Sequence, residues 1–188
     1  MKNSMTKMIV LTLTLVSLLL TSFSASAQSR WATQNIRSAR MIPVRSQAGA
    51  FFTLMPGTPK YDTKQLTMKG GDLITLHKFL YETADRNYAY LVQYNDYADA
   101  YINSDVTKLY DDVMQAGTQN IQGQVIKTAS IVQDGYPARI IRIESQNIVV
   151  TWKMVIVGNR FYQAIFTMLK NAPVPDEADK FLNSFHIG

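Results

Sequence analysis

Residues 147–169 read NIVVTWKMVIVGNRFYQAIFTML, and this stretch predicts a β-hairpin. Every second position from residue 148 to residue 156 is apolar, with Trp152 in the middle, as in a strand that turns one face to a core. Gly158 followed by Asn suits a two-residue turn of type II′, and residues 161–169 return with a similar apolar alternation. We expect the two strands to pair antiparallel at the centre of a sheet and Trp152 to be buried.

Further strands are expected upstream of this hairpin, separated by residues that favour turns. They cover residues 65–68, 73–81, 88–94, 125–132 and 138–144, and an apolar run at 48–55 ends in a turn at 56–59. The strands at 73–81 and 88–94 form a second hairpin. The strands at 125–132 and 138–144 form a meander with the first strand of the central hairpin.

Two amphipathic helices complete the expected elements. The first begins at Ser104, whose hydroxyl can cap a free backbone N–H, and its apolar positions within 106–114 fall on one side. It is expected to stop at Gly117. The second follows residues 173–175 and places an apolar stripe within 178–185. The order of strands, helix, strands and helix predicts the α+β class, with an antiparallel β-sheet flanked by helices.

The amino-terminal residues predict export. Residues 1–27 combine early lysines, an apolar run and a final Ala-Ser-Ala, which is typical of a secretory signal peptide cleaved between Ala27 and Gln28. An uncleaved anchor is the weaker alternative, because the apolar run is shorter than the roughly 20 residues of a spanning helix. We expect a solvated basic arm at 28–47 and a single domain at 48–188. The mature protein would be soluble in the periplasm or extracellular space, and would touch the membrane only through the signal peptide before cleavage.

The composition excludes several kinds of site. The chain has no Cys and only two His, His77 and His186, which removes thiolate metal sites, cysteine nucleophiles and sites built from several imidazoles. Lys and Arg exceed Asp and Glu by 19 to 14, and the excess precedes residue 46. Because a nucleic-acid-binding domain usually carries a basic face, we expect no nucleic-acid partner.

Four short phrases are similar to those of a known family. They are FTLMPGTP at 52–59, DGYPAR at 134–139, VIVGNRFYQ at 155–163 and ADKFLNSF at 178–185. With the order of elements, they resemble the PsbP-like superfamily, which includes extrinsic photosystem II subunits, a Ran-binding nuclear import factor and bacterial exported proteins. The resemblance implies an α/β/α sandwich and a role in binding or assembly, with no shared catalytic motif. Ala138 departs from the Gly that many members have there.

The candidate binding residues lie in the link before the first helix. Tyr97 and Tyr101 stand among Asp99, Asn103 and other polar residues, so we expect their rings to be exposed on a partner-binding surface. The alternative is that both rings fold back to cover the end of the core. Tyr88 and Tyr90 are instead expected to be half-buried residues of the sheet.

These observations predict an exported, non-catalytic binding or assembly protein of the cell envelope or extracellular space. The partner would be a protein or an envelope component, and no cofactor or metal is expected. The acidic residues between Asp96 and Asp112 lack the spacing of a calcium loop and are expected to be solvated. Two alternatives stay open: a structural envelope accessory, and a small-molecule-processing or hydrolase-like enzyme. The enzyme would need His77 in a pocket with a carboxylate and a hydroxyl.

Overall fold

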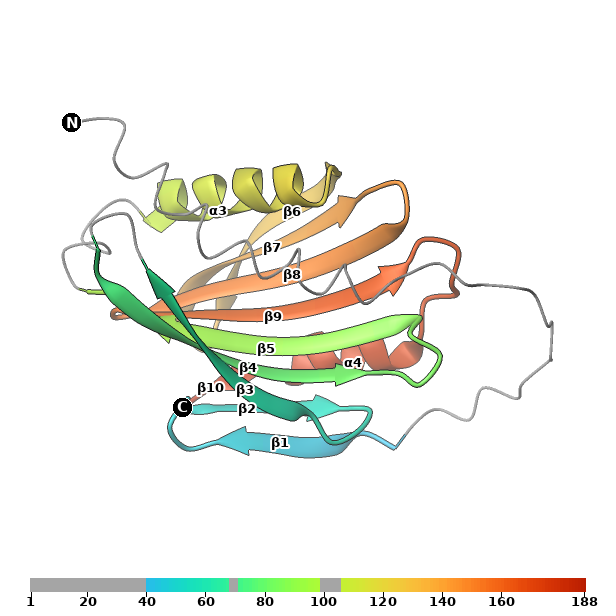
Figure 1. Cartoon of the computed structure of the whole chain (residues 1–188), viewed down its shortest axis with the longest axis horizontal. Helices are drawn as coiled ribbons and strands as arrows, with labels where there is room; N and C mark the ends of the chain where they lie inside the picture. The colour runs from blue at the N-terminus through green and yellow to red at the C-terminus, as the bar shows by residue number, and fades with distance from the viewer. Residues whose placement is uncertain (1–39, 68–70, 99–105) are drawn as a thin grey trace.

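The computed structural model describes residues 40–67, 71–98 and 106–188, and its largest element is an antiparallel sheet (Figure 1). Seven strands of the described chain form this sheet, in the order β3-β4-β5-β9-β8-β7-β6. They are β3 (Lys60–Thr67), β4 (Leu73–Glu82), β5 (Tyr88–Asp96), β6 (Gln124–Gln133), β7 (Tyr136–Glu144), β8 (Ile148–Val157) and β9 (Arg160–Leu169). Every neighbouring pair is antiparallel. The α+β class is confirmed.

The predicted central hairpin is confirmed as β8 and β9. The two strands pair from Ile148 opposite Leu169 to Val157 opposite Arg160, and β9 is the middle strand of the sheet. Gly158 has a φ of 57°, which the first position of a type II′ turn requires. Trp152 is 1% exposed, as expected for the centre of a strand with a core on that face.

One face of the sheet packs against α3 (Val106–Asn120), and this helix buries the apolar stripe that the sequence predicted. The Tyr110 hydroxyl donates to the Pro137 carbonyl oxygen at 2.9 Å and accepts from the Ile156 amide at 3.0 Å. Burial raises the pKa of Tyr110 to about 12. The predicted stop at Gly117 is wrong, because the left-handed residue that ends the helix is Gln122, with a φ of 51°. The start at Ser104 lies outside the described residues.

The opposite face packs against α4 (Asp176–Ser184) and a small second sheet (Figure 1). The small sheet has the order β1-β2-β10, with β1 (Ile42–Ser46), β2 (Phe51–Met55) and β10 (His186–Ile187). Phe181 of α4 meets Tyr90 edge to face, with ring centroids 5.5 Å apart, and both rings are buried. Within the described ranges, the sheet therefore carries one helix on each face.

Two expected boundaries need correction. The arm at 28–47 is not wholly an arm, because β1 lies within it and pairs with β2 along its full length. The described part of the expected strand at 65–68 is the end of a longer strand, β3, whose polar sequence has little alternation to recognise. Residue 68 lies outside the described residues. Residues 28–39 and the expected signal peptide lie outside the described chain. No helix in the described ranges is both long and apolar enough to span a membrane.

Candidate functional site

Of the four predicted binding residues, the structure describes one, Tyr97. Tyr101, Asp99 and Asn103 lie outside the described residues. Tyr97 is only 4% exposed, and its ring stacks on Phe161 in the core under α3, with centroids 6.4 Å apart. The expectation that Tyr97 is exposed is therefore wrong, and the alternative, a ring folded back onto the core, is correct for this residue.

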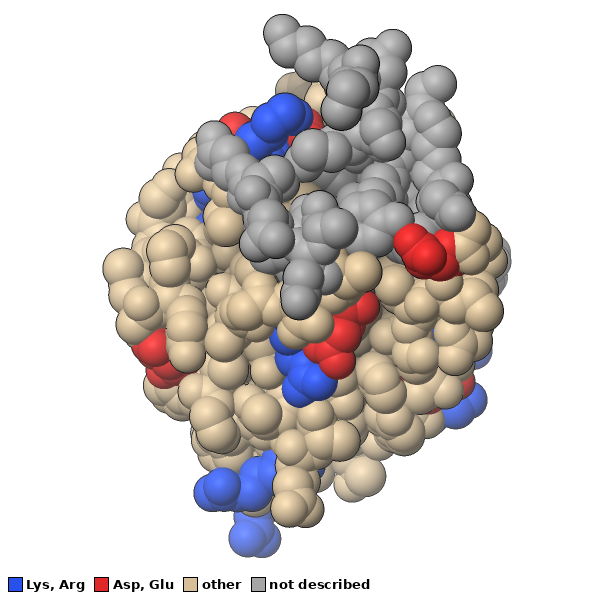
Figure 2. All heavy atoms as spheres, turned by 90° about the vertical axis from the view of Figure 1, so that its left-hand side faces the viewer, with Lys and Arg blue, Asp and Glu red and all other residues tan. Residues whose placement is uncertain are grey.

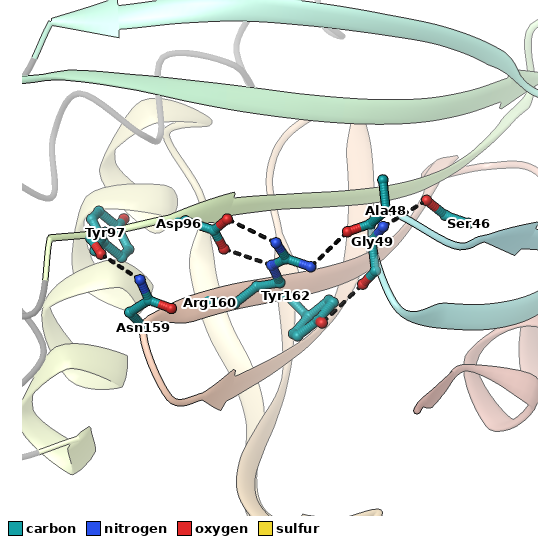
Figure 3. Close-up of polar contacts among 8 residues, drawn as sticks. All are labelled: Ser46, Ala48, Gly49, Asp96, Tyr97, Asn159, Arg160 and Tyr162. Atoms are coloured by element: carbon teal, nitrogen blue, oxygen red, sulfur yellow. Dashed lines mark hydrogen bonds and ion pairs between the residues drawn. The ribbon is translucent and has the colours of Figure 1, made fainter.

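Main-chain hydrogen bonds fix Tyr97 in this position (Figure 3). Its amide donates to the Asn159 carbonyl oxygen at 2.9 Å, and the Asn159 side chain donates back to the Tyr97 carbonyl oxygen at 3.1 Å. The chain thus continues past β5 beside the β8–β9 turn. That path aims the Tyr97 ring into the core.

Arg160 and Asp96 form a clamp beside this link, seen in Figure 3. The Arg160 guanidinium donates twice to the Asp96 carboxylate, at 2.5 and 2.7 Å, and once to the Ala48 carbonyl oxygen at 2.8 Å. The Tyr162 hydroxyl donates to the Gly49 carbonyl oxygen at 2.8 Å. The hydrogen bonds from Arg160 lower the pKa of Asp96. These groups join β5 and β9 to the β1–β2 turn. All of these hydrogen bonds are made to other residues of the chain.

His77 lies in an aromatic stack on the same side of the sheet as α4. Its ring is parallel to Tyr94, with centroids 4.5 Å apart, and its Nδ1 is 2.8 Å from the Tyr61 hydroxyl oxygen. Burial lowers the pKa of His77 from its ordinary value. The Asp96 carboxylate raises this pKa and the Arg160 guanidinium lowers it, and the net shift is downward. A hydroxyl is thus within reach of His77, but the nearby Asp96 carboxylate is held by Arg160.

Three of the acidic residues singled out in the sequence form ion pairs: Asp96 with Arg160, Asp111 with Arg139, and Asp112 with Lys108. Asp99 and Asp105 lie outside the described residues. His186 is exposed and pairs with Asp134 at 2.9 Å. Within the described ranges, no three His, Asp or Glu side chains form a group that could hold a metal ion. At the end of the molecule shown in Figure 2, the charged side chains lie in small separate groups.

A cavity of about 220 Å³ lies on the other part of the α4 face, between the helix and strands β6 to β9. Ile140, Phe166 and Leu182 supply apolar walls. We call it the α4 cavity. Sequence reasoning did not identify it, because its walls come from four strands and a helix that only the folded chain brings together.

The polar side chains of the α4 cavity follow one line across the sheet. Lys127 of β6 lies directly opposite Arg142 of β7. Arg142 in turn lies opposite Thr151 of β8. On the far side of β8, Thr151 lies opposite Phe166 of β9. Asp179 of α4 lines the same cavity. Two cations therefore face one carboxylate, and the cavity has an excess of positive charge.

Lys127 and Arg142 have no ion-pair partner among the described residues. Like charges directly opposite each other in a sheet destabilise it, so this pair is unfavourable within the isolated fold. A β-bulge creates the pair. Val125 lies opposite Ile143, so an unbroken register would set Ile126 opposite Arg142, but Ile126 is skipped and Lys127 takes its place. Bulges re-aim side chains in this way beside functional sites.

The α4 cavity can bind an anionic group through two cationic donors and the Thr151 hydroxyl, with apolar walls for an attached body. Arg142 is half-buried, which strengthens its interaction with an anion relative to a fully solvated cation. No protein-family model matches the chain, and no curated protein matches it.

Proposed function

We propose that the chain is an exported, non-catalytic binding protein whose α4 cavity holds an anionic, partly apolar group of its ligand. The observation that carries the proposal is the opposed pair Lys127 and Arg142, which lacks an ion-pair partner among the described residues. An anion placed between these side chains would remove their mutual repulsion and form charge-assisted hydrogen bonds.

Export is supported by the order of charged, apolar and small residues in 1–27. The resemblance to the PsbP-like superfamily supports a role in binding or assembly, with a protein or envelope component as partner. An antiparallel sheet with a helix on each face is compatible with the sandwich that this resemblance implies. The enzymatic alternative has less support. The carboxylate that acts electrostatically on His77 is that of Asp96, and it already accepts two hydrogen bonds from Arg160.

A titration with octanoate tests the proposal, because octanoate joins a carboxylate to an apolar chain. Binding is followed by ¹H–¹⁵N NMR, with octanol as the probe without charge and inorganic phosphate as the probe without an apolar body. We expect octanoate to shift the signals of Thr151 and Phe166 and to bind more tightly than either comparison probe. Added salt should weaken the binding.

Arg142→Gln is the matched variant for this titration. It should fold, because it relieves a repulsion, and it should weaken octanoate binding roughly tenfold or more, as expected when a hydrogen bond to a charged group is lost. Lys60→Gln, which removes the same charge from exposed β3, should leave binding unchanged. Equal affinities in the two variants, or no binding of octanoate to the unmodified protein, would contradict the proposal.

A further inference from the structure

The outer edge of β6 differs from the other edge of the large sheet. Within the described residues β6 is the last strand and pairs only with β7. It exposes three apolar side chains, with Val125 at 38%, Ile126 at 55% and Val132 at 74%. The opposite edge strand, β3, carries two Lys and one Asp, the kind of charged residues that discourage pairing with another chain. The β6 edge has only one such residue, Lys127.

Lys127 belongs both to this edge and to the α4 cavity. A strand added beside β6 would lie about 4.8 Å away, with one side chain directly opposite Lys127 on the α4 face. That side chain would extend the existing line from Lys127 to Arg142 and Thr151. The edge and the α4 cavity therefore form one continuous surface.

The end of β6 limits how far an added strand could reach. Gln133 donates to the Phe185 carbonyl oxygen at 2.9 Å, and the Ile187 amide donates to Asp134 at 2.8 Å. These bonds place β10 beside the end of β6. Among the residues that the structure describes, the length open to a new strand is the remainder of β6, whose ten residues begin at Gln124.

We propose that the β6 edge binds an extended, acidic peptide segment of a partner protein as an additional strand, with a carboxylate of the peptide facing Lys127 and Arg142. This inference rests on the proposed function, since it names the ligand class of the α4 cavity. Main-chain hydrogen bonds to an open edge give such binding its affinity, and side-chain positions give its specificity.

The charges on the edge favour an acidic partner over a second copy of this chain. The β6 sequence QVIKTASIVQ contains one Lys and no Asp or Glu. A second β6 placed along the first would bring another Lys and no acid from that strand. An acidic peptide would supply the missing negative charge.

The test compares four probes by fluorescence anisotropy and NMR: octanoate and three eight-residue capped peptides. The first peptide is Thr-Val-Glu-Val-Glu-Val-Thr-Ser, the second has Gln in place of each Glu, and the third is the first peptide with alternate amides N-methylated. We expect the acidic peptide to bind and to slow hydrogen exchange of β6 amides. The Gln peptide should bind roughly tenfold more weakly, as expected for lost charge-assisted hydrogen bonds, and the N-methylated peptide should not bind.

The variants separate this inference from the proposed function. Arg142→Gln should weaken the acidic peptide and octanoate together, whereas Lys60→Gln should affect neither. If the N-methylated peptide binds as tightly as its parent and Arg142→Gln still weakens its binding, the inference of an added strand is wrong. The proposed anion site in the α4 cavity is then supported. If neither the acidic peptide nor octanoate binds, both proposals fail. A dimer in sedimentation equilibrium that protects β6 amides without any peptide would show a second copy on the edge and overturn the inference.

Discussion

Breaking the clamp between Arg160 and Asp96 should destabilise the fold at neutral pH more than breaking an ordinary surface ion pair. Arg160 makes two charge-assisted hydrogen bonds to Asp96 and one to Ala48, and its guanidinium carbon lies 4.9 Å from the Tyr94 ring centroid. We expect Arg160→Gln to lower the free energy of unfolding by about 3 kcal/mol, from hydrogen bonds to charged groups and a cation–π contact.

The pair itself accounts for only part of this loss. The Arg160 and Asp96 side chains are 24% and 47% exposed, so water screens their attraction and can solvate Asp96 when Arg160 is removed. A double-mutant cycle with Arg160→Gln, Asp96→Asn and both changes isolates the pair. We expect a coupling energy of about 1–2 kcal/mol at pH 7, above the usual 0–1 kcal/mol of exposed pairs because the geometry is bidentate.

The coupling energy should depend on pH in a defined direction. The pKa of Asp96 is lowered in the folded protein from its ordinary 3.8, so its contribution to stability is complete above the unfolded pKa. It is lost as the pH falls through the lower, folded pKa. Urea unfolding at pH 7 and at decreasing pH below 4 measures this.

An internal control is the pair Lys108 and Asp112 on the surface of α3, where Lys108 is 53% exposed. The cycle with Lys108→Gln and Asp112→Asn should give about 0.3–0.5 kcal/mol, as for other helix pairs of this spacing. If the Arg160–Asp96 cycle gives no more than this control, or does not fall at low pH, the assignment of a structural clamp is refuted.

Three further predictions follow from individual residues. Trp152→Ala should cost about 3–5 kcal/mol in urea unfolding, the range for a fully buried aromatic side chain, and a loss under about 1 kcal/mol would place the ring at the surface. In an NMR titration the midpoint of His77 should lie below its ordinary pKa of 6.5. Arg160→Gln should raise this midpoint, because a repelling cation is removed and the Asp96 carboxylate is freed, and an unchanged midpoint would contradict this. Protein from the extracytoplasmic fraction should begin at Gln28 by intact mass, and a membrane-bound species that keeps Met1 would count against export.

The exposure of Tyr97 was predicted wrongly because the prediction used only its neighbours in the sequence. Its neighbours along the chain, Asp96 and Asp99, are acidic, and this predicted exposure. Yet side chains alternate across a strand, so Tyr97, next after Asp96, points to the opposite face when the chain continues beside the β8–β9 turn. Phe161 lies on that face and packs against the ring. Its position depends on β9 pairing with β5, which no local pattern reveals.

The candidate site could not be predicted from the sequence, because it too depends on contacts between segments far apart in the chain. Lys127 and Arg142 are visible in the sequence as charges within apolar strands, but their opposition depends on a bulge that skips Ile126. The helix that closes the α4 cavity, α4, follows β9 in the chain, yet it packs on the β6–β9 part of the sheet. Neither the skipped residue nor the packing position has a sequence signal of its own.

The central hairpin, the meander before it and the apolar stripes of both helices could be predicted from the order of residues alone. These features follow from periods of two and 3.6 residues and from turns between neighbours in the chain, and such contacts form locally. Three features are visible only in the folded chain: the pairing of β5 with β9, the small sheet that joins β10 to β2, and the α4 cavity with its opposed cations. These contacts join segments far apart in the chain, so their geometry depends on how complete faces pack together and not on any single stretch of residues.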